Sequence, residues 1–290
     1  MSSAATECGS LELTLSSGRI HARWRTRVEG IAVGAPVLCV PGLSANAWSF
    51  ELLAARLADG GRRIMALDLR GRGRSPATAP GTFGWKRHAE DVLEAAHRLG
   101  FATVCLVGHS MGAFVSMQAA ALEPGRIERL VLIDAVGAPE PAVIPPILAS
   151  LERLETVYPS AREYCDRIRR HGAAVPWEEL WERHYLDELE RVPGGVRPRT
   201  SKAAVIEDAL YGAQHDPSEL WPALRMPTLL VRATRQLLPD TGLVVGVAIR
   251  DAFLAAVPSA RLAEVDANHY GVMAHPDALV AIGDFLTNPG

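Results

Sequence analysis

The order of apolar and polar positions in the first half of the chain alternates between strand-like and helix-like stretches. Strands are predicted at residues 11–15, 20–27, 37–40, 63–67, 102–107 and 129–133, and helices near residues 50–57, 85–99 and 111–122. The first two strands meet at Ser17-Gly18, a typical hairpin turn. Strands that alternate with helices are typical of βαβ units, so the pattern predicts an α/β fold.

The pattern changes at Val136. From there to about Arg225 the apolar spacing is helical and is interrupted by Pro and Gly, and no strand is expected. Alternation then resumes, with strands at 227–231 and 261–265 and helices near 247–257 and from 276. We therefore expect one α/β core formed by residues 1–136 and 226–290, interrupted by a helical insertion at residues 137–225.

Composition agrees with a large buried core and limits the partners of the chain. Of its 290 residues, 48% are hydrophobic and 22% charged, and the net charge is −3, without the basic character of nucleic-acid-binding proteins. The apolar runs are far shorter than the ~20 residues that span a bilayer, and the N-terminus lacks a basic stretch followed by an apolar run. We expect a cytoplasmic protein without membrane contact. The sequence is compatible with either a monomer or a homo-oligomer.

The cysteines and histidines do not follow the spacing of metal sites. Four cysteines lie far apart, and Cys39 and Cys105 fall inside apolar runs, which predicts buried reduced thiols. No cluster of His, Cys and carboxylates has metal-ligand spacing, and the chain has no G-x-x-x-x-G-K-[ST] motif. We expect neither a metal nor a cofactor.

One motif indicates a nucleophile. Gly108-His109-Ser110-Met111-Gly112 matches G-x-S-x-G and lies between a predicted strand and a predicted helix, the context that this motif requires. The glycines allow a very tight turn, which lifts the serine hydroxyl clear of the sheet and directs helix N-terminal N–H groups toward developing negative charge. Ser110 is the candidate nucleophile, and an ordinary glycine-rich turn is the alternative.

Four stretches together resemble the α/β-hydrolase superfamily, and they extend over nearly the whole chain. They are Val40–Leu43, Asp68–Ser75, the Ser110 motif and Asn268–Tyr270. The resemblance implies a mostly parallel eight-stranded sheet flanked by helices, with residues 137–225 as a helical cap. In that family the stretch Asp68–Ser75 is structural.

The resemblance also implies an oxyanion hole formed by two backbone N–H groups. These belong to Leu43 and to Met111, which directly follows the candidate nucleophile. The family usually has His-Gly in the first stretch, and here Pro41 replaces that histidine. The backbone N–H of Leu43 is unaffected by this replacement.

A serine nucleophile needs a base, and the base needs an orienting partner. His269 follows the strand at 261–265, precedes the last helix and matches the family's position for the base. A lone loop histidine would otherwise be an ordinary surface residue. Of the other histidines, His109 is assigned to packing and His275 to the surface.

The orienting acid has two candidate positions. The loop after the strand at 228–231 is the commoner family position, but Ala233–Gln236 contains no carboxylate. Asp134 directly follows the apolar strand at 129–133, the alternative family position, and parallel strands would bring it to the same sheet edge as Ser110. We therefore favour Asp134, with Asp240 second.

The insertion carries aromatic residues at helical spacing, Trp177, Trp181 and Tyr185, which predict a packing stripe. Some of them should also line the cleft under the cap, so the resemblance suggests an apolar substrate. The leading hypothesis is a cofactor-independent serine hydrolase that cleaves a carboxylic ester or lactone through an acyl-enzyme. The alternatives are C–C hydrolysis of a diketone or perhydrolysis with the same triad, and a non-enzymatic ligand-binding protein of this fold.

Overall fold

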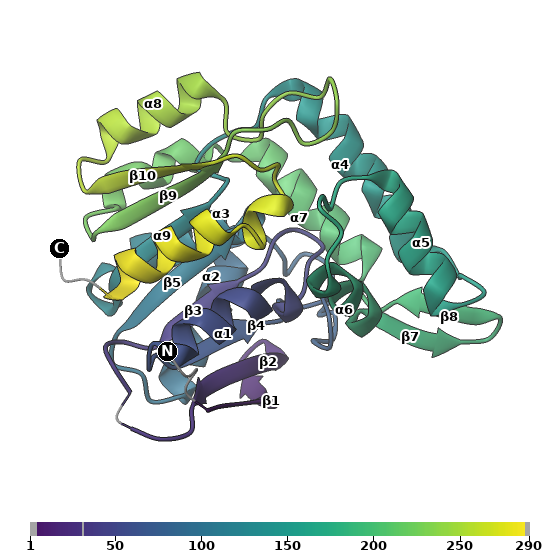
Figure 1. The fold of residues 1–290 in the computed structure, drawn as a ribbon, viewed down its shortest axis with the longest axis horizontal. Helices are drawn as coiled ribbons and strands as arrows, with labels where there is room; N and C mark the ends of the chain where they lie inside the picture. The colour runs from purple at the N-terminus through teal and green to yellow at the C-terminus, as the bar shows by residue number, and fades with distance from the viewer. Residues whose placement is uncertain (1–4, 31, 288–290) are drawn as a thin grey trace.

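The structure is a computed structural model that describes residues 5–30 and 32–287, and it contains an eight-stranded sheet (Figure 1). Across the sheet, the strand order is β1-β2-β4-β3-β5-β6-β9-β10. The strands are β1 (Thr6–Leu15), β2 (Gly18–Arg27), β3 (Val37–Val40), β4 (Ile64–Leu67), β5 (Val104–His109), β6 (Ile127–Ile133), β9 (Thr228–Ala233) and β10 (Ala260–Val265). β2 is antiparallel to both its neighbours, and the pairs from β4 to β10 are parallel, which confirms the predicted α/β sheet.

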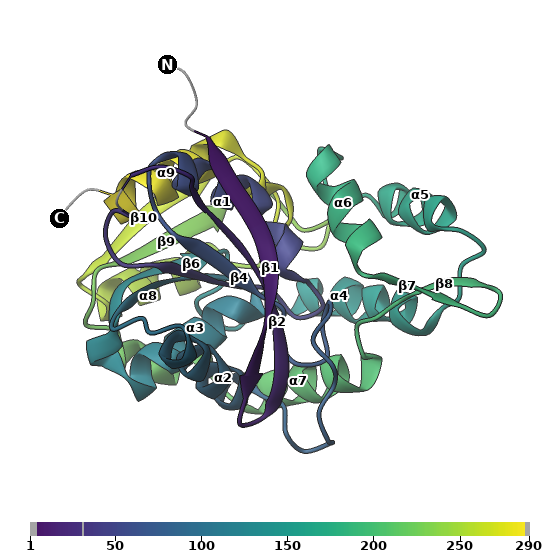
Figure 2. The same cartoon turned by 90° about the horizontal axis from the view of Figure 1, so that it is seen from below.

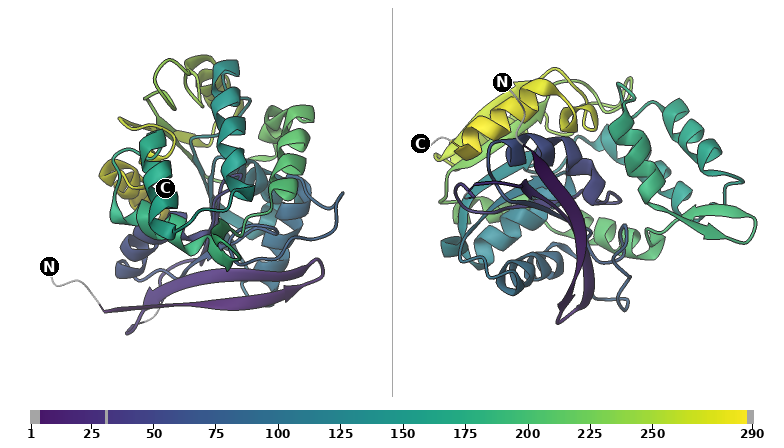
Figure 3. Two further views of the ribbon diagram at one scale, coloured as in Figure 1. Left: turned by 90° about the vertical axis from the view of Figure 1, so that its right-hand side faces the viewer. Right: turned by 60° about the horizontal axis from the view of Figure 1, so that its bottom comes forward.

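The central strands are buried on both faces. Every residue of β3, β4 and β5 is buried, as expected for parallel strands that are covered by helices on each side. The β1–β2 hairpin is different, since exposed and partly buried positions alternate along β1. It lies along one edge of the molecule (Figure 3).

Helices cover both faces of the sheet. They are α1 (Glu51–Asp59), α2 (Trp85–Arg98), α3 (Met111–Leu122), α8 (Val247–Ala256) and α9 (Pro276–Thr287). Val92, Val115 and Phe253, from α2, α3 and α8, belong to one apolar cluster. Leu53 of α1 and Ile282 of α9 belong to the cluster on the other face.

The predicted burial of two cysteines is confirmed. Cys39 and Cys105 are buried and all four cysteines are free thiols. Burial raises the pKa of the Cys105 thiol to about 11, so this group stays protonated at neutral pH.

Residues between β6 and β9 form the insertion, which gathers on one side of the sheet (Figures 1 and 2). It contains η3 (Pro141–Val143), α4 (Ile144–Ser150), η4 (Leu151–Glu155), α5 (Ala161–His171), α6 (Glu179–Asp187), β7 (Leu189–Val192), β8 (Gly195–Pro198), α7 (Lys202–Gln214) and η5 (Pro217–Ala223). The remaining short 3-10 helices are η1 (Ala47–Phe50), η2 (Pro124–Arg126) and η6 (Gly271–Met273).

The expectation that the insertion contains no strand is wrong. β7 and β8 pair as an antiparallel hairpin, and Tyr158 forms an isolated bridge with Val196 of β8. Each strand has only four residues, too few to show an alternating pattern. Pro193-Gly194 lies between them and Gly195 begins β8, so the Pro and Gly that interrupt the helical spacing here mark a hairpin turn.

A buried ionic cluster ties the insertion to the core. Arg72, after β4, is fully buried and its Nη2 donates to Asp208 of α7. Asp208 also contacts His88 Nε2 of α2 at 2.8 Å and accepts from the Gly84 backbone N–H at 2.6 Å. The Nε of Arg72 donates to the carbonyl oxygen of Leu43 at 3.0 Å. Helix α7 is thus connected through one guanidinium to the loop after β3.

The described part of the chain contains neither a membrane-spanning helix nor a metal-binding cluster. Within the described residues, every helix falls short of the length and apolar character that a membrane span requires. Residues 5–30 and 32–287 also contain no group of three or more His, Cys, Asp and Glu side chains arranged to hold a metal ion.

Candidate active site

Ser110 occupies the sharp turn between β5 and α3 that its motif predicts. Its φ is 55°, a region that non-glycine residues rarely adopt, and its ψ is −128°. A Cβ at Gly108 would collide with the Gly112 carbonyl, and a Cβ at Gly112 would collide with the Val40 carbonyl. Both motif glycines are therefore required by the backbone, and the strained turn presents the serine at the sheet edge.

His269 follows β10, and its ring is held by a carboxylate from another strand. Nδ1 of His269 lies 2.9 Å from Oδ2 of Asp134, the residue directly after β6. Asp134 is 1% exposed, and its Oδ1 accepts a 3.0 Å hydrogen bond from the Ala233 backbone N–H. One carboxylate oxygen thus fixes the side chain to β9 while the other faces the imidazole.

The second candidate acid lies elsewhere. Asp240 is exposed, and its backbone N–H donates to the Gln236 side chain at 2.9 Å. The Thr241 hydroxyl donates to the Leu238 carbonyl at 2.7 Å, which closes this loop on itself. Of the two candidates, only Asp134 contacts the imidazole among the described residues.

Ser110 and His269 line the same cavity, which has a volume of about 160 Å³. The structure records no hydrogen bond between the serine hydroxyl and the imidazole within the described residues. Such contacts are often long without substrate and tighten when it binds.

The two candidate oxyanion donors lie beside the nucleophile. Leu43 lines the cavity in the loop after β3, and Arg72 holds its carbonyl group. Met111 begins α3, so its backbone N–H has no acceptor within the helix. The two candidate donors therefore come from different segments, one in the loop after β3 and one at the start of α3.

His109 contacts the candidate base, which the sequence did not indicate. Its Nε2 lies 2.9 Å from the His269 carbonyl oxygen, and the two rings are 4.6 Å apart. Burial, and then the nearby His269, lower the pKa of His109 well below its usual value. The neutral ring donates its N–H to that carbonyl and so positions the backbone of the base.

The predicted cap aromatics divide into two groups. Trp181 and Tyr185, both from α6, line the cavity together with the core residues. Trp177 stacks on Tyr185, with ring centroids 5.9 Å apart and planes at 5°, and among the described residues it is not part of the lining. Trp177 therefore packs against Tyr185, which lines the cavity, rather than lining the cavity itself.

Basic side chains interrupt the otherwise largely apolar lining of the cavity. Arg153, Arg167, His171 and His184 line it, and none was singled out from the sequence. Burial lowers the pKa of His184 to about 3, so that ring is neutral. Isolated basic residues in a helical stretch carry no sequence signal, because only the folding of the insertion brings them to the cavity.

Comparisons with known proteins identify the family to which this fold belongs. A family model described as the alpha/beta hydrolase fold matches residues 35–276. The chain is 34% identical over 198 residues to a putative carbamate hydrolase, RutD, of Variovorax paradoxus (strain S110), which covers 66% of this chain and 74% of that protein. It is 28% identical over 205 residues to an N-formylmaleamate deformylase of Pseudomonas putida, covering 70% and 71%.

A solved structure extends the likeness to the whole fold. The crystal structure of E-2-(acetamidomethylene)succinate hydrolase superposes with a TM-score of 0.85 at 24% identity, covering 97% of this chain and 100% of that one. Several other curated relatives are matched over 35% to 52% of their own length. The chain is therefore a member of the α/β-hydrolase family, and hydrolysis is the general chemistry that its relatives support.

Proposed function

We propose that the chain is a serine hydrolase that cleaves a carboxylic ester or lactone through an acyl-enzyme, without a cofactor. The single observation that carries this is the 2.9 Å contact between His269 Nδ1 and Asp134, in a cavity shared with Ser110. A buried carboxylate on Nδ1 leaves Nε2 as the basic nitrogen, the arrangement that activates a serine hydroxyl.

In the first step, Ser110 Oγ attacks the substrate carbonyl and His269 Nε2 accepts its proton. The tetrahedral oxyanion receives hydrogen bonds from the N–H groups of Leu43 and Met111, and one such donor contributes roughly 10²–10³ in kcat. His269 then gives the proton to the leaving oxygen, and the acyl-enzyme forms.

Water reverses these roles in the second step. His269 removes a proton from a water molecule, which attacks the acyl carbonyl and releases Ser110. Asp134 stays ionised throughout, fixes the Nδ1–H tautomer and stabilises the imidazolium formed in each step.

An amide is the second candidate substrate. The names of two relatives describe a deformylase acting on an N-formyl amide and a carbamate hydrolase. The same three residues serve an amide, provided that His269 protonates the leaving nitrogen. Diketone cleavage and perhydrolysis would also use this triad, but no contact in the cavity favours them.

Labelling by a fluorophosphonate probe tests the proposal. The probe should modify the wild-type chain at Ser110, and a panel of aryl esters, lactones, amides and diketones should show the highest kcat/KM for an ester or lactone. Absence of labelling would favour a ligand-binding protein. Labelling together with a preference for an amide or a diketone would support Ser110 as the nucleophile, but the bond that the chain cleaves would then differ from the proposed ester.

We expect Trp181, which lines the cavity, to limit the size of the substrate acyl group that the cavity accepts. Trp181 is 2% exposed and lines the cavity, so Trp181→Phe should enlarge the site while keeping an aromatic ring in place. We expect the ratio of kcat/KM for a bulky ester to that for a short ester to rise about tenfold, the scale of a small change in pocket size. Trp177→Phe, behind the wall, is the matched control and should leave this ratio nearly unchanged. Equal effects of both changes would contradict the assigned lining.

A further inference from the structure

Besides the neutral His184, three basic side chains reach the candidate site from the insertion. Arg153 of η4 and Arg167 and His171 of α5 line the cavity that contains Ser110. Arg167 and His171 are exposed, whereas Arg153 is largely buried, with 11% of its side chain accessible. Only Arg153 combines a permanent charge with partial removal from water, so it can recognise a polar group most strongly.

Arg153 is held in place by hydrogen bonds, but some of its N–H donors remain unused by the described residues. Its Nη1 donates to the Tyr164 hydroxyl and to Glu188 Oε1, both at 2.6 Å, and its Nη2 donates to the Ser44 hydroxyl at 3.2 Å. A guanidinium has five N–H groups, and these contacts use three. The Nε–H and one N–H of Nη2 make no hydrogen bond to the described residues.

The unused donors suit a carboxylate. Elsewhere in this chain, Arg70 binds Asp91 through the same two nitrogens, Nε to Oδ2 at 2.8 Å and Nη2 to Oδ1 at 2.7 Å. Two parallel N–H groups match the two oxygens of a carboxylate, and this pairing is among the strongest hydrogen-bonded arrangements in proteins.

Arg153 already has one carboxylate partner, Glu188. Glu188 is fully buried at the end of α6, so the pair also anchors η4 within the insertion. It compensates the charge of Arg153 but contacts only the Nη1 end of the guanidinium. Glu152 also lines the cavity, but it is exposed, so water and salt screen its repulsion of an anion.

Two contacts place Arg153 beside the candidate oxyanion hole. Ser44, which accepts from Nη2, directly follows Leu43 in the chain. Leu151 and Leu154, which flank Arg153 on η4, belong to an apolar cluster against which the Leu43 side chain packs. A group bound by Arg153 would therefore lie close to the carbonyl that Ser110 attacks.

We propose that Arg153 forms a carboxylate-binding subsite, so that the substrate carries a free carboxylate a few bonds from its scissile carbonyl. This rests on the proposed hydrolase function and refines the expectation of an apolar substrate to one with an apolar body and an anionic end.

A matched pair of substrates tests the subsite. Mono-4-nitrophenyl adipate carries a free carboxylate, and methyl 4-nitrophenyl adipate is its neutral counterpart with the same scissile bond. The wild-type chain should show a kcat/KM about 10- to 100-fold higher for the acid, the scale of charge-assisted hydrogen bonds. Arg153→Lys keeps the charge but loses the paired donors, and it should lower this preference about tenfold.

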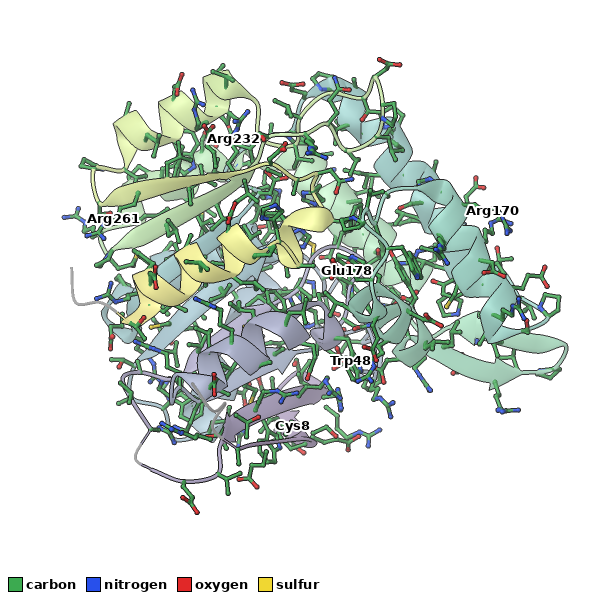
Figure 4. All side chains as sticks on the ribbon, viewed as in Figure 1. Cys8, Trp48, Arg170, Glu178, Arg232 and Arg261 are labelled. Carbon is green, nitrogen blue, oxygen red and sulfur yellow. The ribbon has the colours of Figure 1, made fainter. Side chains whose placement is uncertain are left out.

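Removing the charge requires attention to folding. Arg153→Met leaves Glu188 buried without its partner, so the double change Arg153→Met/Glu188→Gln is the better variant. It should lose the preference for the acid, while turnover of the neutral ester shows that it is folded. If the double variant does not fold, the Arg153→Lys ratio decides. Arg170→Met is the control, since Arg170 lies on the outer side of α5, away from the cavity (Figure 4).

The outcomes separate the two proposals. Equal kcat/KM for both esters, or a ratio that Arg153→Lys leaves unchanged, would overturn the subsite and leave the hydrolase intact. Cleavage of neither ester would argue against the proposed function. Calorimetry then tests the subsite alone: the wild-type chain should bind monomethyl adipate more tightly than dimethyl adipate, and Arg153→Lys should remove the difference. Equal binding of the two would overturn the subsite.

Discussion

Ser110→Ala is expected to reduce kcat for any ester substrate by roughly 10⁶, because losing the nucleophile of such a triad removes nearly all of its effect. Folding should be retained. The alanine keeps the Cβ that the turn already accommodates, and the Ser110 hydroxyl makes no hydrogen bond within the described residues. Turnover of a 4-nitrophenyl ester, together with thermal unfolding, measures both effects.

Ser116→Ala is the matched control for this experiment. Ser116 lies on α3, the helix that follows Ser110, and its buried hydroxyl donates to the Gly112 carbonyl at 2.7 Å. Its removal should cost some stability and retain turnover. A Ser110→Ala variant with near wild-type kcat would refute the whole mechanism.

Asp134→Asn is expected to lower kcat by about 10⁴, the loss that follows when the imidazole is held in the wrong tautomer. Asn tolerates the positive φ of 49° at this position. Its carbonyl oxygen can still accept from Ala233, which directs the amide NH₂ toward His269 Nδ1. That nitrogen must then accept a hydrogen bond, so the proton moves to Nε2 and the base is lost.

Asp240→Asn is the isosteric comparison for this prediction. Its carboxylate is exposed in the loop after β9, so kcat should change by less than about twofold. Circular dichroism and kcat on the same ester test both variants. A large loss in Asp240→Asn with a small one in Asp134→Asn would reverse the assignment of the acid and leave Ser110 and His269 in place.

The elements that surround Ser110 could be predicted because local signals and burial agree there. Helix α3 begins and ends at Met111 and Leu122 as the spacing indicates, and β3 coincides with its apolar run at 37–40. The tight turn at Ser110 fixes where α3 starts, whereas β5 ends at His109, two residues beyond its predicted end. The contact of Asp134 with His269 was predictable because parallel strands end at one edge.

The polar lining of the cavity was not predictable in the same way. Arg153 is held at the cavity by Ser44, Tyr164 and Glu188, which lie 109, 11 and 35 residues away along the chain. No periodicity relates such positions. Trp177 and Tyr185 share one stripe in the sequence, yet one lines the cavity and the other stacks behind it, because stacking depends on ring geometry rather than spacing.

The buried Arg72–Asp208 contact bears on how this enzyme could be redesigned. A protein engineer would treat the insertion as an exchangeable module that confers new selectivity when transplanted from a homologue. Here the guanidinium of Arg72, a core residue, binds Asp208 of the insertion. The same guanidinium donates a hydrogen bond to the carbonyl of Leu43, the candidate oxyanion donor. A transplanted insertion without a carboxylate at position 208 would leave the buried Arg72 guanidinium without its counter-ion and would destabilise the loop that contains Leu43. Successful chimeras of this chain must therefore inherit α7 and Arg72 together.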